Sequence, residues 1–162
     1  MAFCNITGRH LNSLVKTRSS AVVSSAEAKW NVAKLDVDSI LKEVKFNSDG
    51  LVPAIAQQFD SGEVLMMAWM STESIVETLK SRRAVFFSRS RKKLWRKGDT
   101  SGQYQHVHDF KLDCDGDTVL LTVDQLGVAC HTGRRSCFYL AVRDDGLEEI
   151  LPVVIDPDEL YS

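Results

Sequence analysis

Apolar runs of β-forming residues, separated by short polar turns, are the feature that most constrains how this chain can fold. The runs at residues 52–59 and 64–70 flank the turn Asp60-Ser61-Gly62-Glu63, which predicts a β-hairpin. The same composition predicts extended segments at residues 84–90, 106–114, 118–124 and 136–143. The acidic turn Asp115-Gly116-Asp117 joins two of these segments. A mostly β fold follows.

Two segments have helical rather than alternating periodicity. In residues 36–46 the apolar positions are Ile40, Leu41 and Val44, and Asp36 or Asp38 can cap the first turn. In residues 72–81, Ser71 is the expected cap, and the buried stripe consists of Ile75, Val76 and Leu79. The sequence therefore predicts an α+β, mostly β fold: a single compact domain of mixed and antiparallel strands with two short helices.

The composition changes near residue 30, which suggests a domain boundary. The first 26 residues contain no Asp or Glu, are rich in Ser and Thr, and include the cations Arg9, Lys16 and Arg18. This composition is typical of an organelle transit peptide, although a disordered soluble N-terminus has a similar one. We therefore expect a transit peptide at residues 1–30, a folded domain at 31–155 and a polar, frayed tail at 156–162.

The charge distribution indicates the class of ligand. Residues 82–97 hold eight basic residues and no acidic one, whereas the remaining sequence has 12 basic and 22 acidic residues. A local positive patch on a net-negative protein favours a small phosphorylated ligand over a long nucleic acid, which the overall charge would repel. No apolar run approaches the ~20 residues of a membrane-spanning helix, so a transmembrane role is not expected.

The densest chemical signal is the segment Asp113-Cys114-Asp115-Gly116-Asp117. Three carboxylates this close together are costly unless a cation neutralises them. In an extended chain Asp113 and Asp115 share one face while Cys114 points the other way, so one segment can offer oxygen to one metal and sulfur to another. The glycine falls at the wrong position for a helix-loop-helix calcium site. A solvated acidic hairpin tip is the alternative.

Cys4 lies in the expected transit peptide. The other three cysteines cluster within 24 residues: Cys114, Cys130 and Cys137. An odd cluster does not suggest disulfides, whereas three thiolates suit a zinc ion whose fourth position is open for water. A fourth ligand from His106, His108 or His131 would instead make the zinc structural. His131 is poorly placed to bind the same ion as its neighbour Cys130, so we consider it a candidate general base. A purely structural histidine remains the alternative.

The third signal is the basic segment 88–102, in which cations, hydroxyls and two glycines surround one tryptophan. Glycines let backbone amides approach an anion, arginines bind phosphate in a bidentate manner and tryptophan offers a stacking face. Single-stranded nucleic acid is bound by the same kinds of residue, so a zinc-stabilised nucleic-acid-binding module without turnover is the rival interpretation. A merely solvated basic loop is the third interpretation.

Together the three segments resemble the phosphoribosyl-AMP cyclohydrolase family of histidine biosynthesis, over about residues 51–139. The resemblance rests on the run from Ser88 to Gly102, on residues 113–117, and on Cys130-His131-x-Gly-x-x-Ser136-Cys137. It implies Zn²⁺ at Cys114, Cys130 and Cys137, and Mg²⁺ at Asp113, Asp115 and Asp117. The substrate-binding residues that we expect from it and from the basic segment are Trp69, Ser88, Arg89, Arg91, Trp95, Lys97, Thr100 and Ser101.

The resemblance also implies a reaction and an assembly. Water activated by zinc, with His131 as base, would attack C6 of the N1-alkylated adenine ring and break the N1–C6 bond. The family is dimeric with its zinc site between subunits, so we expect a homodimer, and no nucleic-acid or membrane partner. We expect the transit peptide to direct the chain to the chloroplast. Plant family members that resemble this chain usually continue into a phosphoribosyl-ATP pyrophosphohydrolase domain, so this chain resembles the cyclohydrolase half alone. Asp99 departs from the family, where glutamate is expected.

Overall fold

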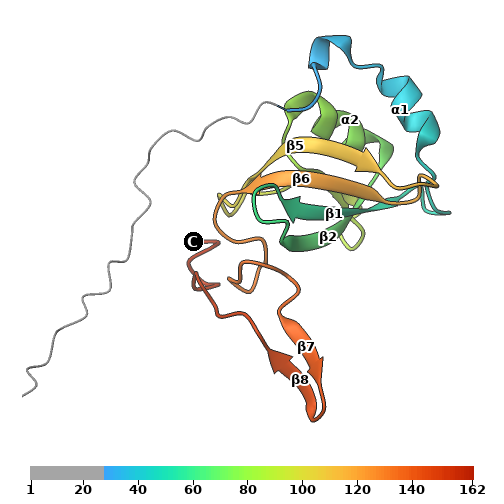
Figure 1. Cartoon of the computed structure of the whole chain (residues 1–162). Coiled ribbons are helices and arrows are strands. Elements are labelled where there is room, and N and C mark those ends of the chain that lie inside the picture. The colour runs from blue at the N-terminus through green and yellow to red at the C-terminus, as the bar shows by residue number, and fades with distance from the viewer. Residues whose placement is uncertain (1–27) are drawn as a thin grey trace, which may run out of the picture.

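A computed structural model describes residues 28–162 of the chain. The transit peptide expected at residues 1–30 therefore lies almost entirely outside the described residues, as does Cys4. The described part is built mainly from strands (Figure 1). Its elements in chain order are η1 (Val32–Lys34), α1 (Val37–Glu43), β1 (Val52–Gln58), β2 (Val64–Met70), α2 (Thr72–Ser81), β3 (Val85–Ser88), β4 (Lys93–Arg96), β5 (Gln105–Leu112), β6 (Val119–Gln125), β7 (Leu140–Arg143) and β8 (Gly146–Glu149).

Six strands form one mixed sheet in the order β4-β3-β2-β1-β6-β5. Strand β1 pairs in parallel with β6, and the other neighbours pair antiparallel. The expected hairpin at residues 52–70 is confirmed as β1 and β2, and the expected segments around the acidic turn are confirmed as β5 and β6. The predicted class, mostly β with two short helices in one compact domain, is confirmed.

The sheet curls so that the start of β3 reaches the edge strand β5. Arg83 forms an isolated antiparallel bridge with His106. On either side of this bridge, the Ala84 amide donates to the Gln105 carbonyl at 3.0 Å, and the Val107 amide donates to the Arg82 carbonyl at 2.8 Å. These bonds join the start of β3 to the start of β5. Because the edges are partly paired in this way, the sheet encloses its core as a barrel does.

Both predicted helices form where their caps indicate. The Asp36 carboxylate accepts from the Ser39 amide at the start of α1. Ser71 and Ser74 make a reciprocal capping box at the start of α2. Such boxes satisfy amides that have no partner within the helix. The apolar face of α2 is buried through Ile75 and Leu79, which belong to the same core as the inward side chains of β1 and β6.

The structure corrects one strand prediction and contains two strands that were not predicted. We expected a strand over residues 136–143, but in this region only Leu140–Arg143 forms a strand, β7. The reason is that the Cys137 amide donates to the Leu65 carbonyl at 2.7 Å and the Ser136 hydroxyl donates to the Val64 carbonyl at 2.8 Å, which fastens this segment to the start of β2. Strands β4 and β8 were not predicted, because β4 is dominated by charged residues and β8 lies beyond an acidic turn.

Strands β7 and β8 form a separate hairpin that projects away from the six-stranded sheet (Figure 1). It carries exposed apolar side chains: Leu140 is 49% exposed, Val142 79% and Leu147 69%. Within residues 28–162, no helix has the length and apolar character needed to cross a membrane.

Candidate active site

The segment from Cys130 to Cys137 folds back on itself and brings two thiols together. Its turn is closed by the Gly133 amide, which donates to the Cys130 carbonyl at 3.1 Å, and by the Cys130 amide, which donates to the Arg134 carbonyl at 3.1 Å. Cys130 is buried, and its sulfur lies 3.0 Å from the Thr132 hydroxyl. The Cys137 residue is exposed. Seven residues apart in sequence, the two sulfurs thus become neighbours in space.

The electrostatics of the two thiols reflect this proximity. Although Cys137 is exposed as a residue, partial desolvation raises the pKa of its thiol to about 12, and the adjacent Cys130 thiol adds to the shift. Two thiolates side by side repel each other. A coordinated cation reverses such a shift, because a coordinating thiol is deprotonated outright. The pair is therefore a donor set that suits a soft divalent metal.

Lys97 faces the same two thiols from the end of β4. The residue is 5% exposed, and among residues 28–162 no carboxylate lies within ion-pair distance of its ammonium group. Burial lowers the pKa of Lys97 to about 8, while the sulfurs of Cys137 and Cys130 oppose that change. A buried cation without an anionic partner is costly. An anionic ligand would supply the missing charge.

These groups line one cavity of about 470 Å³, a size suited to a small-molecule ligand. Strand β4 contributes Trp95, and the turn that precedes β4 contributes Arg91. The turn after Lys97 contributes Thr100 and Ser101. The cavity thus combines five of the eight expected substrate-binding residues with His131 and two of the three expected zinc ligands.

Gly98 belongs to the expected basic segment 88–102, but other residues of the cavity were missed by sequence reasoning: Met66, Met67, Gln103, Val128, Ala129, Leu160 and Tyr161. The two methionines were assigned to a core strand, and the two C-terminal residues to a frayed tail. Leu160 is in fact only 6% exposed, which corrects that expectation for the tail. The signal that could have identified Leu160 and Tyr161 was their position as an apolar pair after the acidic stretch 156–159.

The remaining expected substrate-binding residues, Trp69, Ser88 and Arg89, do not line this cavity. The Arg89 guanidinium lies over the Trp69 ring, 4.9 Å from its centroid. The Ser88 hydroxyl accepts from Arg91 Nε at 3.2 Å, so it contacts a residue that does line the cavity. Their role in binding substrate stays a prediction.

Asp99, the residue that departs from the family pattern, has a defined partner. It accepts from Arg83 at 2.8 Å, and the Arg83 guanidinium also stacks on the Tyr104 ring, 4.2 Å from its centroid. The adjacent Gly98 has φ +91°, and a Cβ atom there would come within 2.6 Å of the Tyr104 ring. The turn that presents Thr100 and Ser101 is therefore fixed from both sides.

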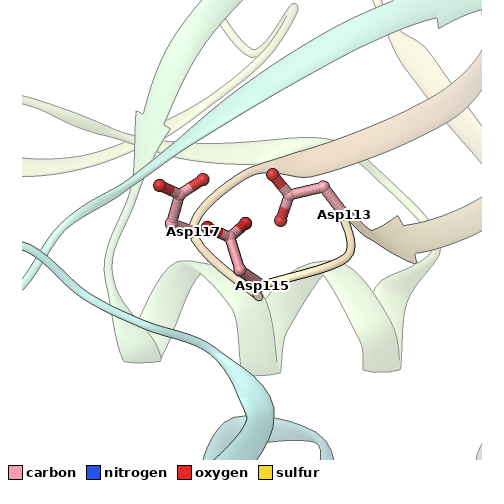
Figure 2. Close-up of side chains that lie close together, drawn as sticks. All are labelled: Asp113, Asp115 and Asp117. Atoms are coloured by element: carbon pink, nitrogen blue, oxygen red, sulfur yellow. The ribbon is translucent and has the colours of Figure 1, made fainter.

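The acidic residues Asp113, Asp115 and Asp117 form a second candidate metal centre at the turn between β5 and β6 (Figure 2). One carboxylate oxygen from each lies within 4.8 Å of the others, and all three residues are exposed. Desolvation acts to raise the pKa of Asp113, but backbone hydrogen bonds, first from the Thr118 amide and then from the Gly116 amide, leave the pKa lowered. Oxygen ligands of this kind suit a hard cation such as Mg²⁺.

The third cysteine does not join the other two within one chain. Cys114 lies in the acidic turn before β6, whereas Cys130 follows the opposite end of that strand. The seven residues of β6 span roughly 20 Å at about 3.3 Å per residue. Among the described residues, the three-residue groups with metal-binding geometry include no cysteine. A site with all three thiols therefore needs a Cys114 from elsewhere.

A second hollow lies along the outer face of α2, lined by Thr72, Glu73, Val76, Glu77, Lys80 and Ser81. It contains two carboxylates and one cation, and Glu77 is already paired with Arg96. This charge balance does not favour a phosphorylated ligand. The cavity with the two thiols is therefore the candidate active site.

Comparison with known proteins identifies the family of the chain. Residues 66–139 match the model of the family described as phosphoribosyl-AMP cyclohydrolase. The phosphoribosyl-AMP cyclohydrolase of Paramagnetospirillum magneticum is 63% identical over 131 residues, which are 81% of this chain and 99% of the relative. That of Rhodospirillum centenum is 62% identical over 126 residues, 78% of this chain and 95% of the relative. The chain belongs to the phosphoribosyl-AMP cyclohydrolase family.

Proposed function

We propose that this chain is a hydrolase of histidine biosynthesis that opens the adenine ring of phosphoribosyl-AMP at the N1–C6 bond. The observation that carries the proposal is the cavity itself, in which two thiols, an imidazole and a buried lysine without a carboxylate partner among residues 28–162 meet. The thiols supply metal-binding capacity, and Lys97 supplies a charge complementary to phosphate.

The zinc ligands in this proposal are Cys130 and Cys137 of one chain and Cys114 of a partner. The donor set fits, because the first two sulfurs are neighbours and the third thiol is exposed at a turn. Three thiolates leave one position of a tetrahedral zinc open. When bound there, zinc would supply Lewis acidity and lower the pKa of water.

The chain's own residues perform the rest of the reaction. His131 lines the cavity beside Cys130 and accepts the proton of the attacking water. The water oxygen forms a bond with C6, the N1–C6 bond breaks, and N1 takes up a proton. Arg91, Lys97 and the hydroxyls of Thr100 and Ser101 hold the phosphates, so that the ring is oriented before attack.

Magnesium would bind at Asp113, Asp115 and Asp117, whose oxygens are close enough to share one ion. Hydrogen bonds from the Thr118 amide and hydroxyl already orient the outer two carboxylates, at 3.1 Å each. In a dimer that brings Cys114 to the partner's thiols, the same turn carries the magnesium toward the partner's cavity. Magnesium bound there would neutralise the charge of substrate phosphate.

The homodimer that this site requires has a candidate contact surface. The β7–β8 hairpin and its flanking residues expose Phe138, Leu140, Val142, Leu147, Val153 and Val154, each at least 49% accessible. Exposed apolar patches of this extent often mark protein contacts. Strand β7 begins three residues after Cys137, so a partner seated there lies close to the thiols.

The alternative of a nucleic-acid-binding module is weaker than the sequence alone suggested. Of the eight basic residues in 82–97, Arg83 and Arg96 are paired with carboxylates, Arg89 is stacked on Trp69, and Lys97 is buried. These contacts reduce the number of cations that are free to bind a nucleic-acid backbone.

The proposed function is tested by incubating the purified, zinc-loaded protein with phosphoribosyl-AMP and Mg²⁺ and following ring opening by absorbance. Turnover that is abolished by a zinc chelator and restored by Zn²⁺ supports the proposal. A zinc-loaded protein with no turnover would contradict it.

We also propose that residues 1–30 direct the chain to the plastid. The support is the composition of that segment, which is basic, rich in Ser and Thr, and free of carboxylates up to residue 26. A fluorescent protein fused behind residues 1–30 should enter plastids, and a diffuse cytosolic signal would contradict the proposal.

A further inference from the structure

The C-terminal segment 156–162 is held next to the thiol segment. After β8 the chain returns, and the amides of Val154 and Ile155 both donate to the Gly133 carbonyl, at 2.8 and 3.2 Å. Val153 also forms a β-bridge with Arg134, whose Nε donates to the Leu151 carbonyl at 3.1 Å. The hydrogen bonds to Gly133, two residues from His131, therefore fix the position at which segment 156–162 begins.

Those last residues form an ordered turn rather than a free tail. The Glu159 amide donates to the Asp156 carbonyl at 3.0 Å, and the Asp158 amide donates to the Asp156 carboxylate at 3.0 Å. The Ser162 hydroxyl donates to the Glu159 carbonyl at 3.1 Å. Leu160, with 6% exposure, anchors the turn in the protein. The position of its neighbour Tyr161 is thereby restricted.

Tyr161 lines the active-site cavity, yet the residue is 56% exposed. The cavity has one other large aromatic residue, Trp95, which packs against Phe86 with ring centroids 5.6 Å apart. Trp95 is thus attached to the core, whereas Tyr161 presents its ring from the C-terminal turn. An exposed aromatic ring in a cavity lined by cations and hydroxyls is suited to stacking on a planar, charged or polar ring.

We infer that Tyr161 is a specificity-determining residue that packs against the purine ring of the nucleotide, with Leu160 as its positioning residue. The inference rests on the proposed function for the identity of that nucleotide. Phosphate is held by the cationic side of the cavity, at Arg91 and Lys97, so the phosphate and the base of the ligand are recognised by different residues. Loss of Tyr161 should weaken binding of the base and leave binding of the phosphate unchanged.

The test compares two probes that differ in the base. AMP carries both purine and phosphate, whereas ribose 5-phosphate carries phosphate alone, and binding of each is measured by calorimetry on the full-length protein. Tyr161→Ala should weaken AMP binding about tenfold, within the range found when an aromatic residue that stacks on a base is removed. The same variant should bind ribose 5-phosphate within about twofold of wild type. Tyr161→Phe should bind both probes as wild type does.

Three further variants separate recognition from general damage. Leu160→Ala should weaken AMP binding in the same selective way, and the Leu160→Ala/Tyr161→Ala double variant should be no weaker than Tyr161→Ala alone. Phe59→Ala removes an exposed aromatic ring, 41% accessible, that does not line the cavity, and it should change neither affinity.

Three results would overturn the inference: AMP that binds Tyr161→Ala as tightly as wild type, equal losses for both probes, or no AMP binding to the wild-type protein. Turnover of phosphoribosyl-AMP is measured separately on the wild type. A protein that binds AMP through Tyr161 without turnover contradicts only the proposed function. If the wild type hydrolyses phosphoribosyl-AMP but Tyr161→Ala binds AMP as tightly as the wild type does, only this inference is contradicted.

Discussion

Gly133 lies directly against the carbonyl group of Ile155, and a Cβ atom at position 133 would overlap that carbonyl oxygen. Gly133 also has φ +75°, a left-handed conformation that side chains disfavour. Its own carbonyl accepts two hydrogen bonds from the same returning chain. One glycine therefore joins the segment that carries both cavity thiols to the C-terminal turn that closes the cavity.

Gly133→Ala should lower the free energy of unfolding by at least 2 to 3 kcal/mol, since it combines the left-handed strain of about 1 kcal/mol with a backbone overlap that no rotamer relieves. Chemical denaturation measures the change. Gly50→Ala is the matched control, because Gly50 has φ +70° and open space around its Cβ position. Equal losses in the two variants would show that the Ile155 contact contributes nothing.

Lys97→Met should raise the KM for phosphoribosyl-AMP by roughly 10- to 100-fold, because a charged hydrogen bond to phosphate contributes about 1.5 to 3 kcal/mol. Stability should stay the same or rise, since the buried ammonium has no carboxylate partner in the described chain to lose. Steady-state kinetics and denaturation measure the two effects. Lys93→Met, at an exposed position at the start of β4, is the control. An unchanged KM would remove Lys97 from the substrate site.

His131→Ala should reduce turnover by roughly 10²- to 10⁴-fold while bound zinc is retained, if the imidazole acts as the base. Metal analysis and kinetics are performed on the same preparation. Lost zinc would instead make His131 a ligand, and unchanged turnover would return it to a structural role.

Asp115→Asn should raise the Mg²⁺ concentration needed for half-maximal activity by at least tenfold, because an amide oxygen carries no formal charge toward the cation. Zinc content should not change. Asp60→Asn, in the exposed turn between β1 and β2, is the control for a lost surface carboxylate. A magnesium requirement identical in all three proteins would contradict the proposed magnesium site.

Zinc ligands contributed by two chains make complementation possible. Cys114→Ser and Cys137→Ser proteins should each lack zinc and activity, because a hydroxyl is a poor zinc ligand beside thiolates. Refolded together at equal concentration, about half of the dimers pair one chain of each kind, and each such dimer has one intact site of two. Activity should therefore return to about a quarter of wild type.

If all three thiols came from one chain, every site would keep one lesion and mixing would restore nothing. Because zinc can also stabilise the dimer, sedimentation of the refolded mixture accompanies the assay. An inactive mixture that is fully dimeric would exclude shared ligands.

Local sequence determined the elements of this protein and the chemistry that it carries. Periodicity and caps predicted α1 and α2, the turn at residues 60–63 predicted the first hairpin, and both the thiols and the acidic triad were recognisable from residue type and spacing alone. These features are local, because a cap, a turn or a chelating segment depends on residues within a few positions of one another.

Tertiary structure decided which of those residues share a site. Strand β1 pairs with β6 more than 60 residues later, and the sheet closes through Arg83 and His106, so no local pattern could show that Lys97 would be buried against Cys130 and Cys137. The same holds for Leu160 and Tyr161. Their polar sequence context did not predict a place in the cavity, which depends on the return of the chain to Gly133. Burial and proximity follow from long-range packing, which composition and spacing do not encode.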